Sequence, residues 1–337
     1  MMELIIDLPV YAPVLKKLQA LDGITVRVLA EPADNARERP VSEIENGALL
    51  LCTIPPVNHT AMKKLELVQI ASAGYTQLIG QGFAERNVRC CNALGVFDVP
   101  IAEWNIAMMI NLARDFRGML HNQQQKIWDR SARFQDEIRG RVVGIWGYGG
   151  IGRETARLAK TLGMTVHVLS RSGVKPRKSA YCVPGTGDPE GLLPDRVFGM
   201  HEKEAFLRSA DFLIMAIPQT GATVGIVGEE ELRSLKPTAF LLNPARGPLV
   251  KEAALIRALK EHWFAGAALD THYHYPMPPE HPLWEMENVI LTPHISGSSA
   301  SPYFLERVWD IFFENVQRFR DRQPLLNELS AAALTGS

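Results

Sequence analysis

Short apolar runs, each bounded by turn-forming or charged residues, recur along the N-terminal part of the chain. Helix-like segments such as APVLKKLQAL, residues 12–21, lie between some of these runs. Apolar strands that alternate with helices are typical of a parallel sheet whose strands are joined by crossover helices. We therefore expect strands at LIID, ITVRVLA, ALLLCT, LVQIASAG and NVRCCNALG.

A long helical pattern, opened by a proline, runs from about residue 100 to 121 in PIAEWNIAMMINLARDFRGML. It separates this first unit from a second unit in which the alternation returns. The apolar runs of the second unit are nearly continuous, as expected for strands that are buried on both faces. The strands predicted there are RVVGIWG, MTVHVLS, DFLIMAI, TAFLLN, FAGAALD and NVILTPH.

Two segments remain outside this alternation. Residues 173–199 form a Pro/Gly-rich stretch, GVKPRKSAYCVPGTGDPEGLLPDRVFG, which predicts an inserted surface loop. Residues from about 301 to 320 have a helical pattern, and this helix can return to the first unit. The predicted fold class is α/β, with two Rossmann- or flavodoxin-like parallel-sheet domains.

The composition favours a globular protein whose substrate is a small molecule. The 337 residues are 46% hydrophobic and 22% charged, as in ordinary globular proteins of about two domains. A net charge of −1 gives no electrostatic reason to expect nucleic acid or an anionic membrane as partner. The N-terminus lacks a basic segment, and no run of about 18 apolar residues occurs, so we expect a cytoplasmic protein. Its four cysteines are expected to be reduced thiols.

A glycine-rich turn follows the strand RVVGIW and precedes the helical RETARLAKTLG. A strand before and a helix after are the context in which GxGxxG marks a dinucleotide site. The first glycine allows the tight turn, the second lets the backbone approach the pyrophosphate, and the third lets helix and strand pack closely. The candidate cofactor-binding residues are Gly147, Tyr148, Gly149, Gly150, Ile151 and Gly152.

The end of the next strand indicates which dinucleotide binds. NAD-binding domains usually have an acidic residue there, which accepts hydrogen bonds from the ribose. This chain has Ser170, Arg171 and Ser172 instead. An arginine flanked by hydroxyls can bind a 2′-phosphate, which a carboxylate would repel. We therefore expect NADP, with NAD possible, and Lys175, Arg177 and Lys178 can add to the positive field. The alternative is that Arg171 is a solvated surface cation.

Three polar residues follow strands of the second unit, namely Arg246, Asp270 and His294. The carboxyl ends of the strands are where ligands bind in open α/β sheets, so we expect these side chains at one site. The alternatives without a catalytic role are that Arg246 is a surface cation at a strand end and that His294 is a core histidine whose ring is hydrogen-bonded.

The segment DTHYHYPMPPEHPLW, residues 270–284, contains His272, His274 and His281. A metal site would need further convergent ligands, and the sequence marks none, so we expect no metal. A proline-stiffened surface loop is the simplest alternative.

With these motifs, the sequence resembles the D-isomer-specific 2-hydroxyacid dehydrogenases, the family of glyoxylate/hydroxypyruvate reductases and phosphoglycerate dehydrogenases. The resemblance spans nearly the whole chain. It rests on GYGGIG, LKPTAFLLNPARG, GAALD, HPLW, NVILTPHISG, ASAGYTQ and AEWNIAMM. It implies a discontinuous substrate domain of residues 1–99 and 297–337, and a Rossmann domain of residues 100–296.

The resemblance also implies roles for individual residues. Arg246 would bind the carboxylate and the carbonyl oxygen of the substrate, and His294 would protonate that oxygen as hydride arrives. Asp270 would orient the nicotinamide carboxamide. The backbone at Ala73, Gly74 and Tyr75 would hold the carboxylate from the opposite domain. Further cofactor contacts would come from Ile217, Pro218, Asn243, Ala245, His294 and Gly297.

The chain departs from the family pattern at one position. The family's glutamate, which pairs with the histidine, lies five residues after the aspartate, and here this position is Tyr275. We expect an NADP(H)-dependent oxidoreductase that interconverts a small 2-oxo acid and a D-2-hydroxy acid, as a homodimer. The alternatives are a formate-type dehydrogenase of a small anion and a nucleotide-sensing protein like the corepressor relatives.

Overall fold

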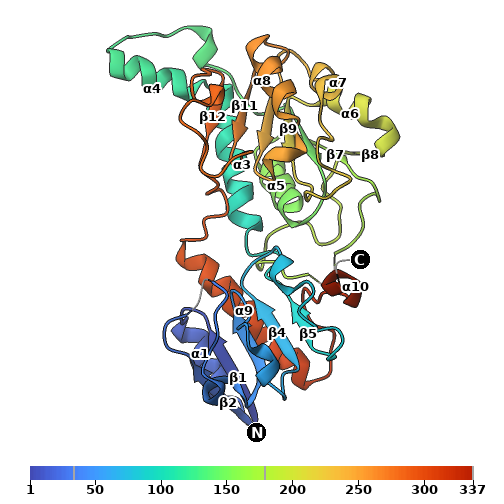
Figure 1. Ribbon diagram of the computed structural model, residues 1–337. Coiled ribbons are helices and arrows are strands. Elements are labelled where there is room, and N and C mark those ends of the chain that lie inside the picture. Colours follow the sequence, from blue (N-terminus) through green and yellow to red (C-terminus); the bar gives the residue numbers. More distant parts are fainter. Residues whose placement is uncertain (33–34, 178–179, 336–337) are drawn as a thin grey trace. The chain divides into compact units, whose positions relative to one another are not determined.

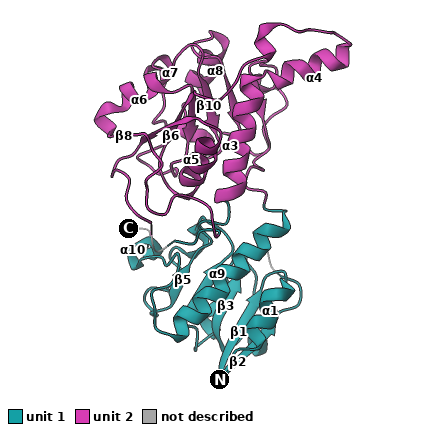
Figure 2. Ribbon diagram, turned by 180° about the vertical axis from the view of Figure 1, so that it is seen from behind, with its two compact units in different colours: residues 1–97, 178–183, 299–337 teal, residues 98–177, 184–298 magenta. Residues whose placement is uncertain are grey.

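The computed structural model describes residues 1–337 apart from 33–34, 178–179 and 336–337. The chain divides into two compact units (Figure 2). Unit 1 consists of Met1–Phe97, Lys178–Val183 and Ser299–Ser337, and unit 2 consists of Asp98–Arg177 and Pro184–Ser298. Each unit is built on one parallel sheet, so the predicted α/β fold with two parallel-sheet domains is confirmed.

The sheet of unit 1 has the order β2-β1-β3-β4-β5. Every predicted strand of this unit is present. Residues of β3 are all buried, as is typical of a central parallel strand. The strands are β1 (Met2–Asp7), β2 (Ile24–Val28), β3 (Gly47–Cys52), β4 (Leu67–Ile70) and β5 (Arg89–Cys91).

Helices cover this sheet. The predicted C-terminal helix is α9, which starts after Ser301, whose hydroxyl accepts a hydrogen bond from the N–H of Tyr303. On its apolar face, Trp309 and Phe312 are fully buried in the core of unit 1. Figure 1 shows α9 lying along the sheet of this unit. The helices of this unit are α1 (Ala12–Gln19), α2 (Val41–Ile44), α9 (Pro302–Arg320) and α10 (Ala331–Thr335), with 3-10 turns η1 (His59–Ala61) and η2 (Thr76–Leu78).

The sheet of unit 2 has the order β12-β11-β10-β9-β6-β7-β8, with all pairs parallel. The six predicted strands are present, and the segment 173–199 adds an edge strand that the sequence did not predict, β8. The strands are β6 (Val142–Trp146), β7 (Thr165–Leu169), β8 (Arg196–Phe198), β9 (Phe212–Met215), β10 (Phe240–Asn243), β11 (Gly266–Leu269) and β12 (Val289–Leu291).

The prediction of a single helix from about residue 100 to 121 is wrong, because two helices, α3 and α4, cover this stretch. Asp115 adopts a left-handed conformation with φ of 43°, and its side chain accepts a hydrogen bond from the N–H of Gly118. This cap ends α3 and starts α4, which projects from the rest of unit 2 (Figure 1). The helices of this unit are α3 (Asp98–Ala113), α4 (Phe116–Gln125), α5 (Gly150–Thr161), α6 (Lys203–Ser209), α7 (Glu229–Arg233) and α8 (Glu252–Lys260), with 3-10 turns η3 (Ala132–Phe134), η4 (Met200–Glu202), η5 (Gly247–Leu249) and η6 (Pro282–Trp284).

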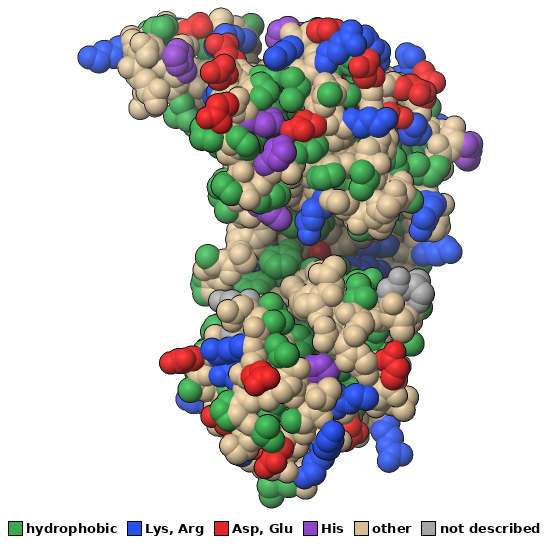
Figure 3. All heavy atoms as spheres, viewed as in Figure 1, with side chains coloured by type: hydrophobic (Ala, Val, Ile, Leu, Met, Phe, Trp, Pro, Cys, Tyr) green, Lys and Arg blue, Asp and Glu red, His purple; other side chains and the backbone are tan. Residues whose placement is uncertain are grey.

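The surface carries both signs of charge. On the face drawn in Figure 3, Lys and Arg side chains alternate with Asp and Glu side chains, as the 36 basic and 37 acidic residues of the sequence lead one to expect. Within the described part of the chain, no helix has both the length and the apolarity that a bilayer span requires.

Candidate active site

The glycine turn between β6 and α5 has the geometry that a dinucleotide needs. Gly147 has a φ of +100°, and a Cβ added to it would lie 2.6 Å from the carbonyl oxygen of Ala216. A Cβ on Gly152 would lie 2.6 Å from the carbonyl oxygen of Gly147, so helix and strand could not pack as they do. Around Gly149, no described atom lies within 4 Å of the Cβ position, so a ligand can approach its backbone. The three glycines therefore fit the pyrophosphate of a dinucleotide.

The other expected residues of this turn surround it. Tyr148 is buried, and its hydroxyl donates to Asp188. Ile151 is half-buried in the first turn of α5. Beyond the end of β9, the Cγ2 atom of Ile217 would lie 2.7 Å from a Cβ on Gly147, so this segment borders the turn. Pro218 follows, and its carbonyl oxygen accepts a hydrogen bond from the hydroxyl of Thr223.

The end of β7 presents hydroxyls and a cation. The hydroxyl of Ser170 donates to the carbonyl oxygen of Gly173 at 2.9 Å, while Arg171 and Ser172 are exposed. Among the described residues, Arg171 has no ion-pair partner, so its guanidinium is available to an anion. Lys175 is exposed, and Lys178 lies outside the described residues.

The turn after β10 presents Arg246. The side chain of Asn243, which is buried, accepts hydrogen bonds from the N–H groups of Ala245 and Arg246 at 3.2 and 3.3 Å. Its amide also donates to the carbonyl oxygen of Arg246 at 2.9 Å. Asn243 thus fixes a turn from which Arg246 extends to the surface, with one guanidinium N–H on the carbonyl oxygen of Ala245. Direct contacts of Asn243 and Ala245 to a cofactor stay predictions.

Asp270 follows β11 and is fully buried. Its two oxygens accept hydrogen bonds from the Thr292 hydroxyl, from the N–H of Ile295 at 2.9 Å, and from the N–H and hydroxyl of Ser296. A carboxylate has about four lone-pair positions, and these donors fill them. Asp270 therefore fastens the loop that contains His294 and leads to Gly297. Its expected contact to a nicotinamide carboxamide stays a prediction.

His294 lies in this loop after β12, with a left-handed φ of 57°. Partial burial lowers the pKa of His294 from its ordinary value of 6.5, and the nearby cation of Arg246 and the imidazole of His272 lower it further, while Asp270 raises it. Because β10, β11 and β12 are adjacent parallel strands, the turns that follow them, which contain Arg246, Asp270 and His294, lie at one edge of the sheet. A positive charge and a titrating imidazole therefore share one site at the strand ends of β10 and β12.

Tyr275, at the position of the family's glutamate, packs beside this histidine. The ring centroids of Tyr275 and His294 are 5.6 Å apart. The Tyr275 hydroxyl accepts a hydrogen bond from the N–H of His272 at 3.0 Å, and among the described residues it makes none to the His294 ring. Tyr275 therefore supplies no carboxylate to His294, and among the described residues it is Asp270 that favours the charged form of this histidine.

The other histidines of the loop have a different partner. The Nε2 atom of His281 lies 2.8 Å from a carboxylate oxygen of Glu252, and that of His274 lies 3.9 Å from it. The ring of His272 contacts the carbonyl oxygen of Thr292 at 2.8 Å. Within the described residues, no three His, Cys, Asp or Glu side chains converge as metal ligands would. The loop packs beside His294 through Tyr275 and contacts α8 through Glu252.

The ASAGY loop of unit 1 is held open by side chains. Asn92 donates to the carbonyl oxygen of Ala73 at 2.7 Å, and Ser72 donates to that of Gly74 at 2.7 Å. The backbone N–H groups of Gly74 and Tyr75 have no acceptor among the described residues. Two adjacent N–H groups in this state suit a carboxylate, which is the role expected for them.

Sequence reasoning missed several residues that shape these loops. Asp188 and Arg153, which contact Tyr148, carry no motif, and Asp188 lies in a segment that we expected to be a plain surface loop. Glu252 pairs with His281, which lies 29 residues further along the chain. The only local signal is the basic residue that directly follows the glycine turn, Arg153.

The fold and this geometry define a class of protein. A parallel sheet with a glycine turn after β6, and an arginine and a histidine at the same edge of the sheet after β10 and β12, is the arrangement of a dinucleotide-dependent oxidoreductase of carboxylate substrates.

Comparisons with known proteins identify the family. The NAD binding domain model of the D-isomer specific 2-hydroxyacid dehydrogenases matches residues 106–296. A glyoxylate reductase of Pyrococcus furiosus is 31% identical over 287 residues, which cover 81% of this chain and 80% of that protein. For a glyoxylate reductase of Korarchaeum cryptofilum, the identity is 31% over 267 residues, 77% of this chain and 74% of that protein.

A solved structure agrees with these sequence matches. The crystal structure of a D-isomer specific 2-hydroxyacid dehydrogenase family protein from Aeromonas salmonicida subsp. salmonicida A449 has a TM-score of 0.76 and 26% identity, and covers 98% of this chain and 99% of that one. The chain belongs to the D-isomer specific 2-hydroxyacid dehydrogenase family. It is an NAD(P)-dependent oxidoreductase that acts on 2-oxo or 2-hydroxy acids.

Proposed function

We propose that this enzyme reduces a small 2-oxo acid to the D-2-hydroxy acid and prefers NADPH to NADH. The observation that carries the proposal is the placement of Arg246 and His294 at the same edge of the sheet, after the parallel strands β10 and β12. The preference for NADPH is supported by Arg171, an exposed cation without an ion-pair partner among the described residues, at the strand end where NAD-binding domains usually have a carboxylate.

In this proposal, each side chain has one task. The guanidinium of Arg246 binds the carboxylate of the substrate and polarises its carbonyl oxygen. The N–H groups of Gly74 and Tyr75 bind the same carboxylate. The dinucleotide supplies a hydride when it is bound. The imidazolium of His294 donates a proton to the carbonyl oxygen, so the carbonyl group becomes a hydroxyl group and the histidine becomes neutral.

The remaining residues hold this geometry. Asn243 shapes the turn of Arg246 through hydrogen bonds at 2.9 to 3.3 Å. Asp270 holds the loop of His294 in place because it accepts hydrogen bonds from the backbone N–H groups of Ile295 and Ser296. Both are buried, so neither can move without breaking these contacts. They act as positioning residues for the two groups that touch the substrate.

The experiment that tests the proposal follows the absorbance of NADPH and NADH with a panel of 2-oxo acids. We expect turnover of glyoxylate-sized substrates with NADPH, and a loss of about 10²-fold or more in kcat/KM for Arg246→Ala and His294→Ala. Nucleotide binding without turnover of any 2-oxo acid would favour the corepressor-like alternative. Reduction of NADP or NAD by formate would favour the formate-type alternative.

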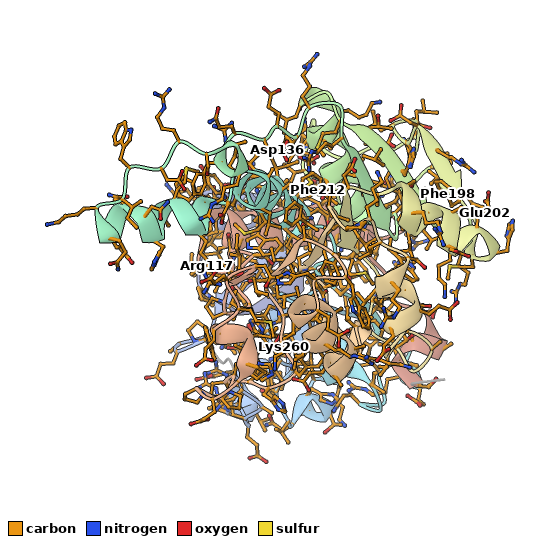
Figure 4. The ribbon with its side chains drawn as sticks, turned by 90° about the horizontal axis from the view of Figure 1, so that it is seen from above. Arg117, Asp136, Phe198, Glu202, Phe212 and Lys260 are labelled. Carbon is orange, nitrogen blue, oxygen red and sulfur yellow. The ribbon has the colours of Figure 1, made fainter. Side chains whose placement is uncertain are left out.

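We also propose that the enzyme is a homodimer joined through unit 2. The projecting helix α4 and the residues after it expose apolar side chains, with Leu120 47%, Ile127 54% and Trp128 90% exposed. At the base of α4, Arg117 and Asp136, together with Lys260, border a hollow of about 1130 Å³ (Figure 4). A second copy of the same chain would cover this apolar arm, and two-fold dimers are the commonest assembly.

A further inference from the structure

The segment 173–199, which interrupts unit 2 after β7, is fastened to the nucleotide turn. The buried carboxylate of Asp188 accepts a hydrogen bond from the hydroxyl of Tyr148 at 2.6 Å. It also accepts three from its own segment, from the N–H groups of Gly191, Leu192 and Leu193 at 2.9 to 3.0 Å. Asp188 therefore folds the segment and ties it to the second residue of the GYGGIG turn.

Arg153, in the first turn of α5, makes a second attachment. Its guanidinium is buried and donates to the carbonyl oxygens of Asp188 and Lys175. The same group lies over the ring of Tyr148, 4.9 Å from its centroid. The two arms of the segment are thus held by one helix turn, and their positions depend on it.

These attachments hold Arg177 over the start of α5. The N–H of Arg177 donates to the carbonyl oxygen of Pro189 at 2.8 Å, next to Asp188. A Cβ on Gly150, the first residue of α5, would lie 2.5 Å from the NH1 atom of Arg177 and 1.7 Å from a carboxylate oxygen of Asp98. The absence of a side chain at Gly150 therefore leaves the space that this guanidinium and carboxylate fill.

The contact between Arg177 and Asp98 is weak. Their side chains are 3.5 Å apart, whereas charge-assisted hydrogen bonds are about 2.7 to 2.9 Å long. It is the only side-chain hydrogen bond that Arg177 makes among the described residues, and its side chain is 20% exposed. A guanidinium has five N–H donors, so most of them remain for another acceptor.

The acceptor that this place suits is a diphosphate. The N-terminus of α5, a 12-residue helix, points its N–H groups to the position where a dinucleotide places its pyrophosphate. We propose that Arg177 binds the diphosphate of the cofactor, and that Asp188 and Arg153 hold it there. The proposal rests on the proposed use of a dinucleotide at this site. It assigns Arg177 to a group that NAD and NADP share, and Arg171 to the 2′-phosphate that only NADP has.

Isothermal titration calorimetry with two fragments of the cofactor tests this division. ADP carries the diphosphate, and adenosine 2′-monophosphate carries the phosphate specific to NADP. We expect Arg177→Gln to weaken the binding of ADP, NADH and NADPH about tenfold or more and to leave the affinity for adenosine 2′-monophosphate unchanged. We expect Arg171→Ala to weaken the binding of adenosine 2′-monophosphate and NADPH and to leave the binding of ADP and NADH unchanged. Arg208→Gln, which removes an exposed arginine of α6, is the matched control, and thermal melting shows whether each variant folds.

A double variant separates contact with the diphosphate from neutralisation of Asp98. If Arg177 binds the diphosphate, Asp98→Asn with Arg177→Gln still binds ADP weakly. Recovery of normal ADP affinity in the double variant would overturn the proposal, since Arg177 would then only compensate the charge of Asp98. Unchanged ADP affinity in Arg177→Gln would overturn it as well.

The proposed function fails in a different way. If the unaltered protein binds ADP but not adenosine 2′-monophosphate, the proposed preference for NADPH is contradicted. Weaker binding of ADP by Arg177→Gln would still support the inference. A normal protein that binds neither fragment nor NADH overturns both.

Discussion

The rings of Tyr275 and His294 lie 5.6 Å apart between centroids, at an interplanar angle of 54°. A phenol thus occupies the place beside the histidine where the resemblance to the family leads one to expect a carboxylate. A carboxylate would favour the charged imidazolium, and a neutral phenol does not. Burial is the main cause of the lowered pKa of His294, and the charge of Arg246 lowers this pKa further.

The first prediction concerns pH. Reduction needs the imidazolium, and the pKa of His294 is below 6.5. We expect kcat/KM for 2-oxo acid reduction to be highest in acid and to fall about tenfold per pH unit above the pKa of His294. Tyr275→Glu should move this fall upward by about one pH unit or more. Tyr275→Phe is the matched control and should leave it in place. A plateau past pH 8 in the unaltered enzyme would mean that another group is the acid.

The second prediction concerns the substrate itself. The cation of Arg246 lowers the pKa of His294, and a substrate carboxylate bound to Arg246 would offset that charge. Profiles of kcat/KM report the pKa in the free enzyme, and profiles of kcat report it in the substrate complex. We therefore expect the fall in kcat to lie at higher pH than the fall in kcat/KM. Coincident profiles would show that the substrate carboxylate does not reach Arg246.

The third prediction concerns Arg171. Loss of one charge-assisted hydrogen bond to the 2′-phosphate costs about 1.5 to 3 kcal/mol. Arg171→Ala should raise the KM for NADPH about tenfold or more and leave the KM for NADH nearly unchanged. Steady-state kinetics with both cofactors measure this. Equal use of NADPH and NADH by the unaltered enzyme would contradict the assignment.

The fourth prediction concerns Asp270. In Asp270→Asn, the amide replaces one of the two oxygens that accept from Thr292, Ile295 and Ser296. Unsatisfied buried donors cost about 1 to 3 kcal/mol, so Tm should fall by several degrees. The negative charge that raises the pKa of His294 is also lost, so the pH profile should move to lower pH. Thr292→Val removes one hydrogen bond but keeps the charge, and should lower Tm without moving the profile.

The fifth prediction concerns assembly. Trp128 is 90% exposed on the projecting arm, and burial of an aromatic side chain contributes strongly to an interface. Light scattering should give the mass of a dimer at micromolar concentration. Trp128→Asp should shift the mass toward that of one chain, whereas an exposed substitution in unit 1, Val10→Asp, should not. A monomeric mass for the unaltered protein would refute the proposal.

The strands were predictable because burial on both faces requires continuous apolar runs. All six residues of β3 are buried, for example. The edge strand β8 was not, because Arg196 and Val197 are exposed and only Phe198 enters the core. The break between α3 and α4 depends on Asp115, whose cap forms only when the chain turns there.

The places of Arg246 and His294 after β10 and β12 were predictable because ligand-binding residues of open α/β sheets follow strand ends, while their roles stay predictions. The partner of Tyr148 was not, because Asp188 is 40 residues away and nothing in its local sequence marks a contact. Likewise, Glu280 lies within the loop, directly before His281, whereas His274 and His281 pair with Glu252 of α8. Such contacts depend on how the loops fold back, which the local pattern does not encode.

The order of strands in unit 2 has a consequence for how such an enzyme changes over time. Arg171 follows β7 on one side of β6, whereas Arg246, Asp270 and His294 follow β10, β11 and β12 on the other. If Arg171 sets the preference for NADPH, as we propose, a mutation on the β7 side redirects the enzyme from the cell's biosynthetic reducing pool to its catabolic one and leaves the reaction chemistry intact. Cofactor choice and chemistry would then be separately heritable traits of one sheet.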